Sequence, residues 1–199
     1  IRRGVDTLIN EGTISGASHG IEVVDYDASN RGSIDLLVNL GTIEGEQFDV
    51  YVKEINRIGT FINAQSSLTY RGPLPQFYAI HIDSPQAFGS LDVTSPSGFL
   101  TFQIDENSSL SDNTLYPAVL TGVSPLNVDP FGNPVQGTFN DLQWSLVPNE
   151  EVEDQWDLCV GDCTASALPV PVAGPWSLTL LAMFSGLLGL SALRRRRLS

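Results

Sequence analysis

Alternation of apolar and polar residues runs through most of the chain and predicts β-strands. Short β-branched segments at residues 20–25, 33–39 and 48–52 are each bounded by Gly, Asn or Asp, which favour turns. Residues 176–193 break this pattern, because they form an apolar run of 18 residues without a charge. The pattern therefore predicts an all-β body followed by one apolar C-terminal helix.

A seven-residue motif is repeated near the start of the chain. Residues 10–16 read Asn-Glu-Gly-Thr-Ile-Ser-Gly, and residues 39–45 read Asn-Leu-Gly-Thr-Ile-Glu-Gly, 29 positions later. We interpret residues 56–61 as a decayed third copy. Offsets of this size, with Asn in turns and Gly at positive φ, favour the end of a right-handed parallel β-helix. A β-sandwich is the alternative, because the same segments also read as hairpins, with residues 27–32 as a turn.

This motif resembles the passenger domains of autotransporter adhesins and filamentous bacterial surface proteins. The segments that follow resemble the Gly-x-Leu-x-Val series that closes many such β-helices; they are residues 88–94, 98–104, 115–120 and 137–139. The resemblance implies an architecture rather than an activity. We therefore expect β-helix coils over residues 1–70 and a β-rich closing region over residues 71–158.

The apolar run has the features of a transmembrane helix. Eighteen residues would span about 27 Å as a helix, close to the ~30 Å hydrocarbon core of a bilayer. Trp176 takes the position of an interfacial aromatic residue. The cytoplasmic end is marked, by the positive-inside rule, by Arg194, Arg195, Arg196 and Arg197. This predicts a span in a bacterial inner membrane, with the residues before it outside the cytoplasm.

The segment Val-Pro-Val-Ala-Gly-Pro-Trp lies at residues 170–176, where the apolar run begins. It resembles the IPTL-CTERM sorting tails of Gram-negative bacteria, which are relatives of PEP-CTERM tails. Val170, Pro171 and Trp176 match that tail in type and spacing, whereas the two residues after Pro171 replace its Thr-Leu pair. The resemblance implies recognition by an exosortase-like membrane protease and delivery of the body to the cell surface or the medium.

Two cysteines, Cys159 and Cys163, lie four positions apart. A structural zinc site normally needs four ligands, and His19 and His81 lie far away in sequence without ligand spacing. In an exported protein a small disulfide loop is therefore the favoured interpretation. Residues 159–175 are expected to form a linker that contains this pair and the sorting motif, with the membrane helix and arginine cluster over residues 176–199.

Charge is distributed unevenly along the chain. All 23 acidic residues lie at or before Asp162 with only six Arg and Lys, which gives that part a charge of −17. Such a polyanionic body argues against binding to nucleic acid or to an anionic lipid surface. We expect the chain to contact the membrane through its C-terminal helix alone.

Few residues in the body have the spacing of a catalytic or metal site. The sequence contains no Gly-rich phosphate loop, nucleophile elbow or His-Glu zinc motif. Asp25, Asp27 and Ser29, with Asp35 ten residues after Asp25, resemble the start of a calcium loop, but its later Gly and Glu are missing, which favours a solvated turn. His81 and Asp83 alternate along one strand face, so an acid/base pair and an exposed face explain them equally.

Two larger sets also have a functional and a structural interpretation. Paired carboxylates for sugar cleavage could be drawn from Asp25, Asp27, Asp49 and Asp83. Aromatic side chains that could stack on sugars, but that are more often core residues in strands, are Tyr51, Phe61, Tyr70, Phe77 and Tyr78.

These observations favour a non-enzymatic protein, exported and sorted to the surface of a Gram-negative bacterium, of the adhesin or extracellular-matrix type. Because the chain opens on Ile1 without an export signal, we interpret it as the C-terminal piece of a longer protein or as a processed product. Its glycan or matrix ligand would bind the missing N-terminal part, and no cofactor is expected. The alternatives are an exported polysaccharide-active enzyme and a structural spacer.

Overall fold

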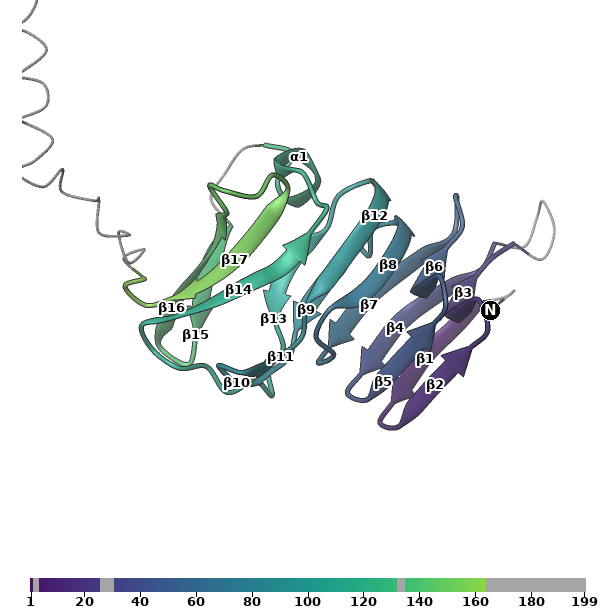
Figure 1. The fold of residues 1–199 in the computed structure, drawn as a ribbon, viewed down its shortest axis with the longest axis horizontal. Coiled ribbons are helices and arrows are strands. Elements are labelled where there is room, and N and C mark those ends of the chain that lie inside the picture. The colour runs from purple at the N-terminus through teal and green to yellow at the C-terminus, as the bar shows by residue number, and fades with distance from the viewer. Residues whose placement is uncertain (2–3, 26–30, 132–134, 164–199) are drawn as a thin grey trace, which may run out of the picture. The chain divides into compact units, whose positions relative to one another are not determined.

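The computed structural model describes residues 1, 4–25, 31–131 and 135–163 (Figure 1). These residues belong to one compact unit, Ile1–Cys163. Within them the one helix is the four-residue α1, Pro125–Val128, and none is long and apolar enough to cross a membrane. Outside the described residues lie the predicted span 176–193 and the predicted functional residues Val170, Pro171, Trp176, Arg194, Arg195, Arg196 and Arg197.

A five-stranded parallel sheet forms one side of the unit. Its strands, in spatial order, are β1 (Gly4–Asn10), β4 (Ser33–Asn39), β7 (Arg57–Asn63), β9 (Phe77–Ile80) and β13 (Thr101–Ile104). Each strand pairs in register with the next, so the chain returns to the same sheet after each excursion. In Figure 1 this advance appears as the change of colour from purple at β1 to teal at β13.

The second large sheet has eight strands and mixed direction. Its parallel part contains β3 (His19–Val23), β6 (Phe48–Val52), β8 (Leu68–Pro73), β12 (Leu91–Ser97) and β14 (Thr114–Thr121). Its antiparallel part adds β17 (Gln155–Val160), β16 (Leu142–Pro148) and β15 (Gln136–Phe139) beyond β14. Because β8 crosses residue 70 and pairs with both β6 and β12, the sheet continues across the division expected between residues 70 and 71.

Two small sheets complete the described strands. β2 (Thr13–Gly16) and β5 (Thr42–Gly45) pair in parallel, and β10 (Ile82–Ser84) pairs antiparallel with β11 (Ala87–Phe88). The side chain of Gln65 lies where a further neighbour of β5 would pair. Its Nε2 donates to the carbonyl oxygen of Ile43 at 3.0 Å, and its Oε1 accepts from the amide of Ile43 at 2.7 Å. The amide side chain thus satisfies the backbone groups that a third strand would have bonded.

A ladder of buried asparagines links the first three strands of the parallel sheet. The Asn10 Nδ2 donates to Asn39 Oδ1 at 2.8 Å, and the Asn39 Nδ2 donates to Asn63 Oδ1 at 3.0 Å. The third copy of the motif therefore aligns at Asn63, and the placement at residues 56–61 was wrong. Asn56 has another role, since its buried Oδ1 accepts from the amide of Gly32 at 2.6 Å.

Three glycines of the repeated motif, Gly16, Gly41 and Gly45, serve close backbone approach rather than positive φ, whereas a Cβ on Gly12 would meet nothing within 4 Å. A Cβ on Gly41 would lie 2.1 Å from the carbonyl oxygen of Gly12, and one on Gly45 would lie 2.1 Å from that of Phe48. Any side chain there would separate the stacked segments, so Gly is required. Among the described glycines, positive φ occurs instead at Gly72, Gly98, Gly122 and Gly161.

The core lies between the two large sheets and repeats the strand register. Leu37 pairs with Phe61, Phe61 with Tyr78, and Tyr78 with Phe102, all of them buried. Ring centroids along this row are 5.9 Å apart for Phe61–Tyr78 and 6.1 Å for Tyr78–Phe102. Trp144 on β16 ends the row at 5.8 Å from Phe102, so the antiparallel part closes one end of the core.

The predicted fold class needs correction. The body is all-β, as expected, but its sheets are mixed, and neither a regular parallel β-helix nor a transmembrane helix is found in the described residues. Two features interrupt the repeat: Gln65 replaces a strand after β7, and the neighbours of β14 on one side are antiparallel. The sequence motif reports only the first two copies, and these are the most regular part of the body.

Candidate functional site

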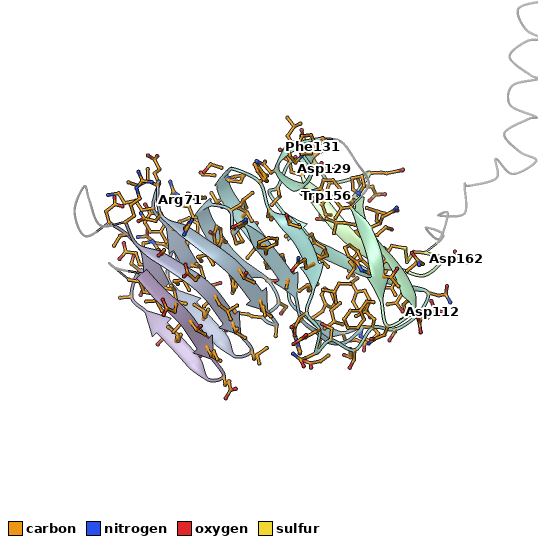
Figure 2. The ribbon with its side chains drawn as sticks, turned by 180° about the vertical axis from the view of Figure 1, so that it is seen from behind. Arg71, Asp112, Asp129, Phe131, Trp156 and Asp162 are labelled. Atoms are coloured by element: carbon orange, nitrogen blue, oxygen red, sulfur yellow. A yellow bond between two sulfur atoms is a disulfide. The ribbon has the colours of Figure 1, made fainter. Side chains whose placement is uncertain are left out.

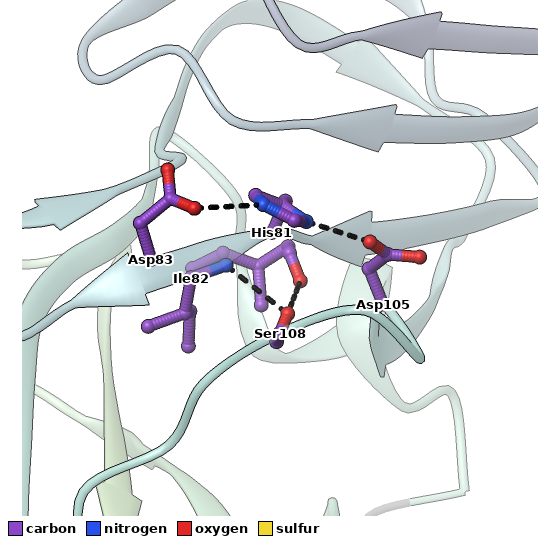
Figure 3. A network of polar contacts seen from close by, with 6 residues as sticks. His81, Ile82, Asp83, Asp105 and Ser108 are labelled. Carbon is purple, nitrogen blue, oxygen red and sulfur yellow. Dashed lines mark hydrogen bonds and ion pairs between the residues drawn. The ribbon is translucent and has the colours of Figure 1, made fainter.

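His81 lies between two carboxylates, one of which the sequence predicted (Figure 3). Its Nε2 is 3.2 Å from Asp83 Oδ1, and its Nδ1 is 2.7 Å from Asp105 Oδ2. The Asp105 side chain is 6% exposed and the Asp83 side chain 71% exposed, so only one of the two carboxylates is desolvated. Register explains the contact: Asp105 directly follows β13, which pairs with β9, and His81 directly follows β9.

Both ring nitrogens of His81 have a contact within the protein. Each nitrogen lies within hydrogen-bond distance of a carboxylate oxygen, so a substrate would have to displace one of the two carboxylates to reach the ring. The nearby hydroxyl of Ser108 accepts from the amide of Ile82 at 3.1 Å and donates to the carbonyl oxygen of Ile80 at 3.3 Å. Figure 3 shows these bonds directed to backbone atoms and not to the histidine. The cluster therefore lacks the nucleophile–base contact of covalent catalysis.

The other predicted carboxylates are not brought together. Asp49 accepts from the amides of Thr69 at 2.8 Å and Gly45 at 3.2 Å, so it links neighbouring strands. Asp25 forms an ion pair with Lys53 at 3.4 Å. Asp27 lies outside the described residues. No carboxylate pair for sugar cleavage is formed among those that the structure places.

The described residues do not form the calcium site that the sequence suggested around Asp25 and Asp35. Asp25 faces a lysine, Asp35 is exposed on β4, and the residues between Asp25 and Arg31 lie outside the described part. Across residues 4–25, 31–131 and 135–163, no group of three or more His, Cys, Asp and Glu side chains could hold a metal ion.

The predicted aromatic set divides into core and surface residues. Phe61, Tyr70 and Tyr78 are fully buried, and burial raises the pKa of both tyrosine hydroxyls well above the ordinary value. Phe77 is half-buried at the start of β9. Tyr51 differs from the core tyrosines, because it is half-buried on β6 and contacts other aromatic side chains at the surface.

Tyr51 belongs to a surface group that we call the outer aromatic cluster, formed by His19, Phe48, Tyr51 and Arg71. The His19 ring stacks on Tyr51 at 4.7 Å and 24°, and is parallel to the Phe48 ring at 6.2 Å and 6°. The Arg71 guanidinium lies 5.3 Å from the Phe48 ring centroid. Arg71 is exposed and the three rings are half-buried, so the cluster presents aromatic surface and one positive charge to solvent.

A shallow groove adjoins the cluster. It has a volume of about 350 Å³ and is lined by Tyr51, Glu54, Arg71, Ser95 and Ser97, together with backbone of β8. The glycine at position 72 has φ +114°, and a Cβ there would lie 1.9 Å from the carbonyl oxygen of Val52. This residue therefore lets β8 lie close against β6 at the base of the groove. Figure 2 shows where Arg71 lies on the body.

Cys159 and Cys163 form a disulfide, as the sequence predicted, with their Cα atoms 5.6 Å apart. The bridge closes a turn directly after β17 and next to β14: the amide of Asp162 donates to Asn113 Oδ1 at 3.1 Å. The last described residues are thus held against the antiparallel end of the mixed sheet.

Comparison with known proteins adds no assignment. No protein-family model, curated protein or solved structure matches the chain.

Two residues of the candidate sites, Asp105 and Arg71, were not predicted from the sequence. Asp105 lies 24 positions from His81, the same offset that pairs β4 with β7 and β9 with β13. That shared offset was the available signal. Arg71 reaches the aromatic rings through a different offset, 20 positions from its partner Tyr51, and the repeated motif does not predict it.

Proposed function

We propose that this chain is an exported, non-enzymatic binding protein of the adhesin or extracellular-matrix type, sorted to the surface of a Gram-negative bacterium through its C-terminal tail. The observation that carries the binding role is the outer aromatic cluster beside its groove. Binding sites are commonly lined by aromatic side chains together with a few polar groups, and the half-buried rings of the cluster lie next to such groups.

Export and sorting are supported by two separate observations. The disulfide between Cys159 and Cys163 is a bond of oxidising compartments outside the cytoplasm. The sequence from Val170 to the final arginines has the order of a sorting tail: a Pro-containing motif, an apolar run and a basic end. An exosortase-like protease is the partner that this order implies.

A polysaccharide-active enzyme is the second candidate, and the His81 cluster is the observation in its favour. A histidine between two carboxylates is a common element of acid/base sites. We rank this candidate below a binding role, because both ring nitrogens are engaged and the buried Asp105 has little contact with solvent.

The binding role is tested by presenting the full chain with immobilised polysaccharides and with extracellular-matrix proteins, and by assaying the same polysaccharides for new reducing ends. We expect saturable binding to at least one class and no product. Product formation that His81→Ala abolishes would establish the enzyme instead. A chain that binds nothing above background would be a structural spacer.

The sorting role has its own test. Deleting Arg194 to Arg197 removes the charges that orient the apolar run, so we expect reduced retention in the membrane fraction or inverted orientation. The matched control deletes Leu198 and Ser199, which follow the arginines and have no charge. If the arginine deletion fractionates like the intact chain, the proposed anchor is wrong.

A further inference from the structure

We propose that the outer aromatic cluster and its groove bind a neutral oligosaccharide. This inference rests on the proposed binding function and names its ligand class. Four features of the described surface point to this ligand: a group of half-buried aromatic rings, neighbouring donors and acceptors, the balance of charge, and the size of the groove.

The first feature is the ring platform. His19 comes from β3, and Phe48 and Tyr51 come from the paired strand β6; ring-centroid distances of 6.2 Å from His19 to Phe48 and 4.7 Å from His19 to Tyr51 gather the three rings in one group. All three rings keep part of their surface in water. A sugar ring presents a face of C–H groups of matching extent, and burying that face against an aromatic ring removes apolar surface from water.

The second feature is the polar rim. The residues that line the groove include Tyr51, Glu54, Arg71, Ser95 and Ser97. Glu54, Arg71, Ser95 and Ser97 are exposed residues, and their side chains supply both donors and acceptors. Sugar hydroxyls donate and accept at once, so they match a rim that offers both kinds of group.

The third feature is charge. Arg71 and Glu54 place one positive and one negative group in the same groove, so the site itself has no net preference for an ion. The body as a whole is polyanionic, with only six Arg and Lys against 23 acidic residues. An anionic glycan or a nucleic acid would be repelled by this field, whereas a neutral saccharide would not.

The fourth feature is size. A volume of about 350 Å³ lies at the lower end of the range for small-molecule sites, and it suits a short oligosaccharide lying across the strands. Because the groove is shallow, we expect weak binding at a single site. A surface-displayed protein compensates through many copies that engage one polymer.

The test measures retardation of the full chain, in mild detergent, in native gels that contain mannan, a β-glucan, xylan or the anionic polymer pectate. We expect retardation by at least one neutral polymer and none by pectate. Tyr51→Ala should reduce the apparent affinity about tenfold or more, and Arg71→Gln should reduce it several-fold. Tyr51→Phe should keep most of the binding, because the ring remains.

Phe131→Ala is the matched control, since Phe131 is 87% exposed and lies apart from Arg71 (Figure 2). It should bind like the parent. Thermal midpoints of all variants exclude unfolding as the cause of a loss.

Retardation by neutral polymers that Tyr51→Ala and Arg71→Gln leave unchanged would overturn the inference, and so would retardation by pectate alone. Binding to matrix proteins without binding to any glycan would also overturn it, but would leave the proposed function intact. If neither class binds, both proposals are refuted.

Discussion

Replacing Asn39 tests whether the asparagine ladder holds the stacked strands together. Its side chain is fully buried and makes three hydrogen bonds, with Asn10 at 2.8 Å, Asn63 at 3.0 Å and Gln65 at 3.1 Å. Each bond is worth about 1 kcal/mol net. Asn39→Ala should therefore reduce the free energy of unfolding by about 3 kcal/mol.

The estimate stays near this value because the neighbours keep other partners. Asn10 still donates to the carbonyl oxygen of Thr42 at 3.0 Å, and the Asn63 Oδ1 still accepts from the amide of Gln65 at 3.1 Å. No buried polar group that bonded Asn39 is left wholly unpaired, which would raise the cost further.

The assay is urea unfolding of the full chain followed by the fluorescence of its tryptophans, of which Trp156 is buried. Asn107→Ala is the matched control, because Asn107 is exposed and should change the free energy by less than about 0.5 kcal/mol. If Asn39→Ala changes stability no more than this control does, the ladder does not stabilise the stack.

Asn39→Asp provides a second, pH-dependent test of the same site. The new carboxylate would be buried opposite two acceptor oxygens, Asn63 Oδ1 and Gln65 Oε1, so burial should raise its pKa above the unfolded value. Its protonated form can donate one hydrogen bond. The variant should therefore lie closest to the parent in stability at low pH and lose stability as pH rises. A penalty that does not change with pH would refute this account of the site.

Three further predictions follow from buried or linked side chains. Changing both Cys159 and Cys163 to Ser should lower the free energy of unfolding by about 2 kcal/mol, as expected for a short loop, and reductant should lower that of the parent but not of the variant. His81→Ala leaves the Asp105 carboxylate buried without its partner and should cost about 2–3 kcal/mol, part of which Asp105→Asn should restore in the double variant. Burial raises the pKa of Tyr70 and Tyr78, so their contribution to stability is complete below the unfolded pKa of about 10. As pH rises beyond that value, the free energy of unfolding should fall by about 1.4 kcal/mol per pH unit for each tyrosine. Tyrosinate absorbance during alkaline unfolding checks this, and ionisation without unfolding would contradict it.

The sequence allowed the first two copies of the repeat to be aligned, because both contain the full motif. Asn10 and Asn39 match in the motif and pair in the structure. The third copy keeps the ladder asparagine but loses the strand after it, since Gln65 substitutes for that strand. Because the third copy lacks the complete Gly-Thr-Ile sequence, Asn56 and Asn63 matched the first residue of the motif equally well. The strand register, which pairs Asn39 with Asn63, distinguishes them.

Local pairs were predictable and distant pairs were not. Cys159 and Cys163 lie four positions apart, so a turn between them is enough to bring them together. His81 and Asp105 meet because two strands pair with an offset of 24 positions. The antiparallel end of the mixed sheet was also missed, since the alternation of apolar residues in β16 and β17 does not report strand direction.

The outer aromatic cluster depends on an irregular offset between two paired strands. β4 and β7 pair with an offset of 24 positions, but β6 and β8 pair with an offset of 20. The difference arises because the chain passes from β7 to β8 without the strand that Gln65 replaces. With an offset of 24, Tyr51 would have faced Pro75. The shorter offset pairs Tyr51 with Arg71 instead and places a guanidinium over the Phe48 ring. The loss of one strand from the repeat thus creates the charged and aromatic surface on which the binding proposal rests.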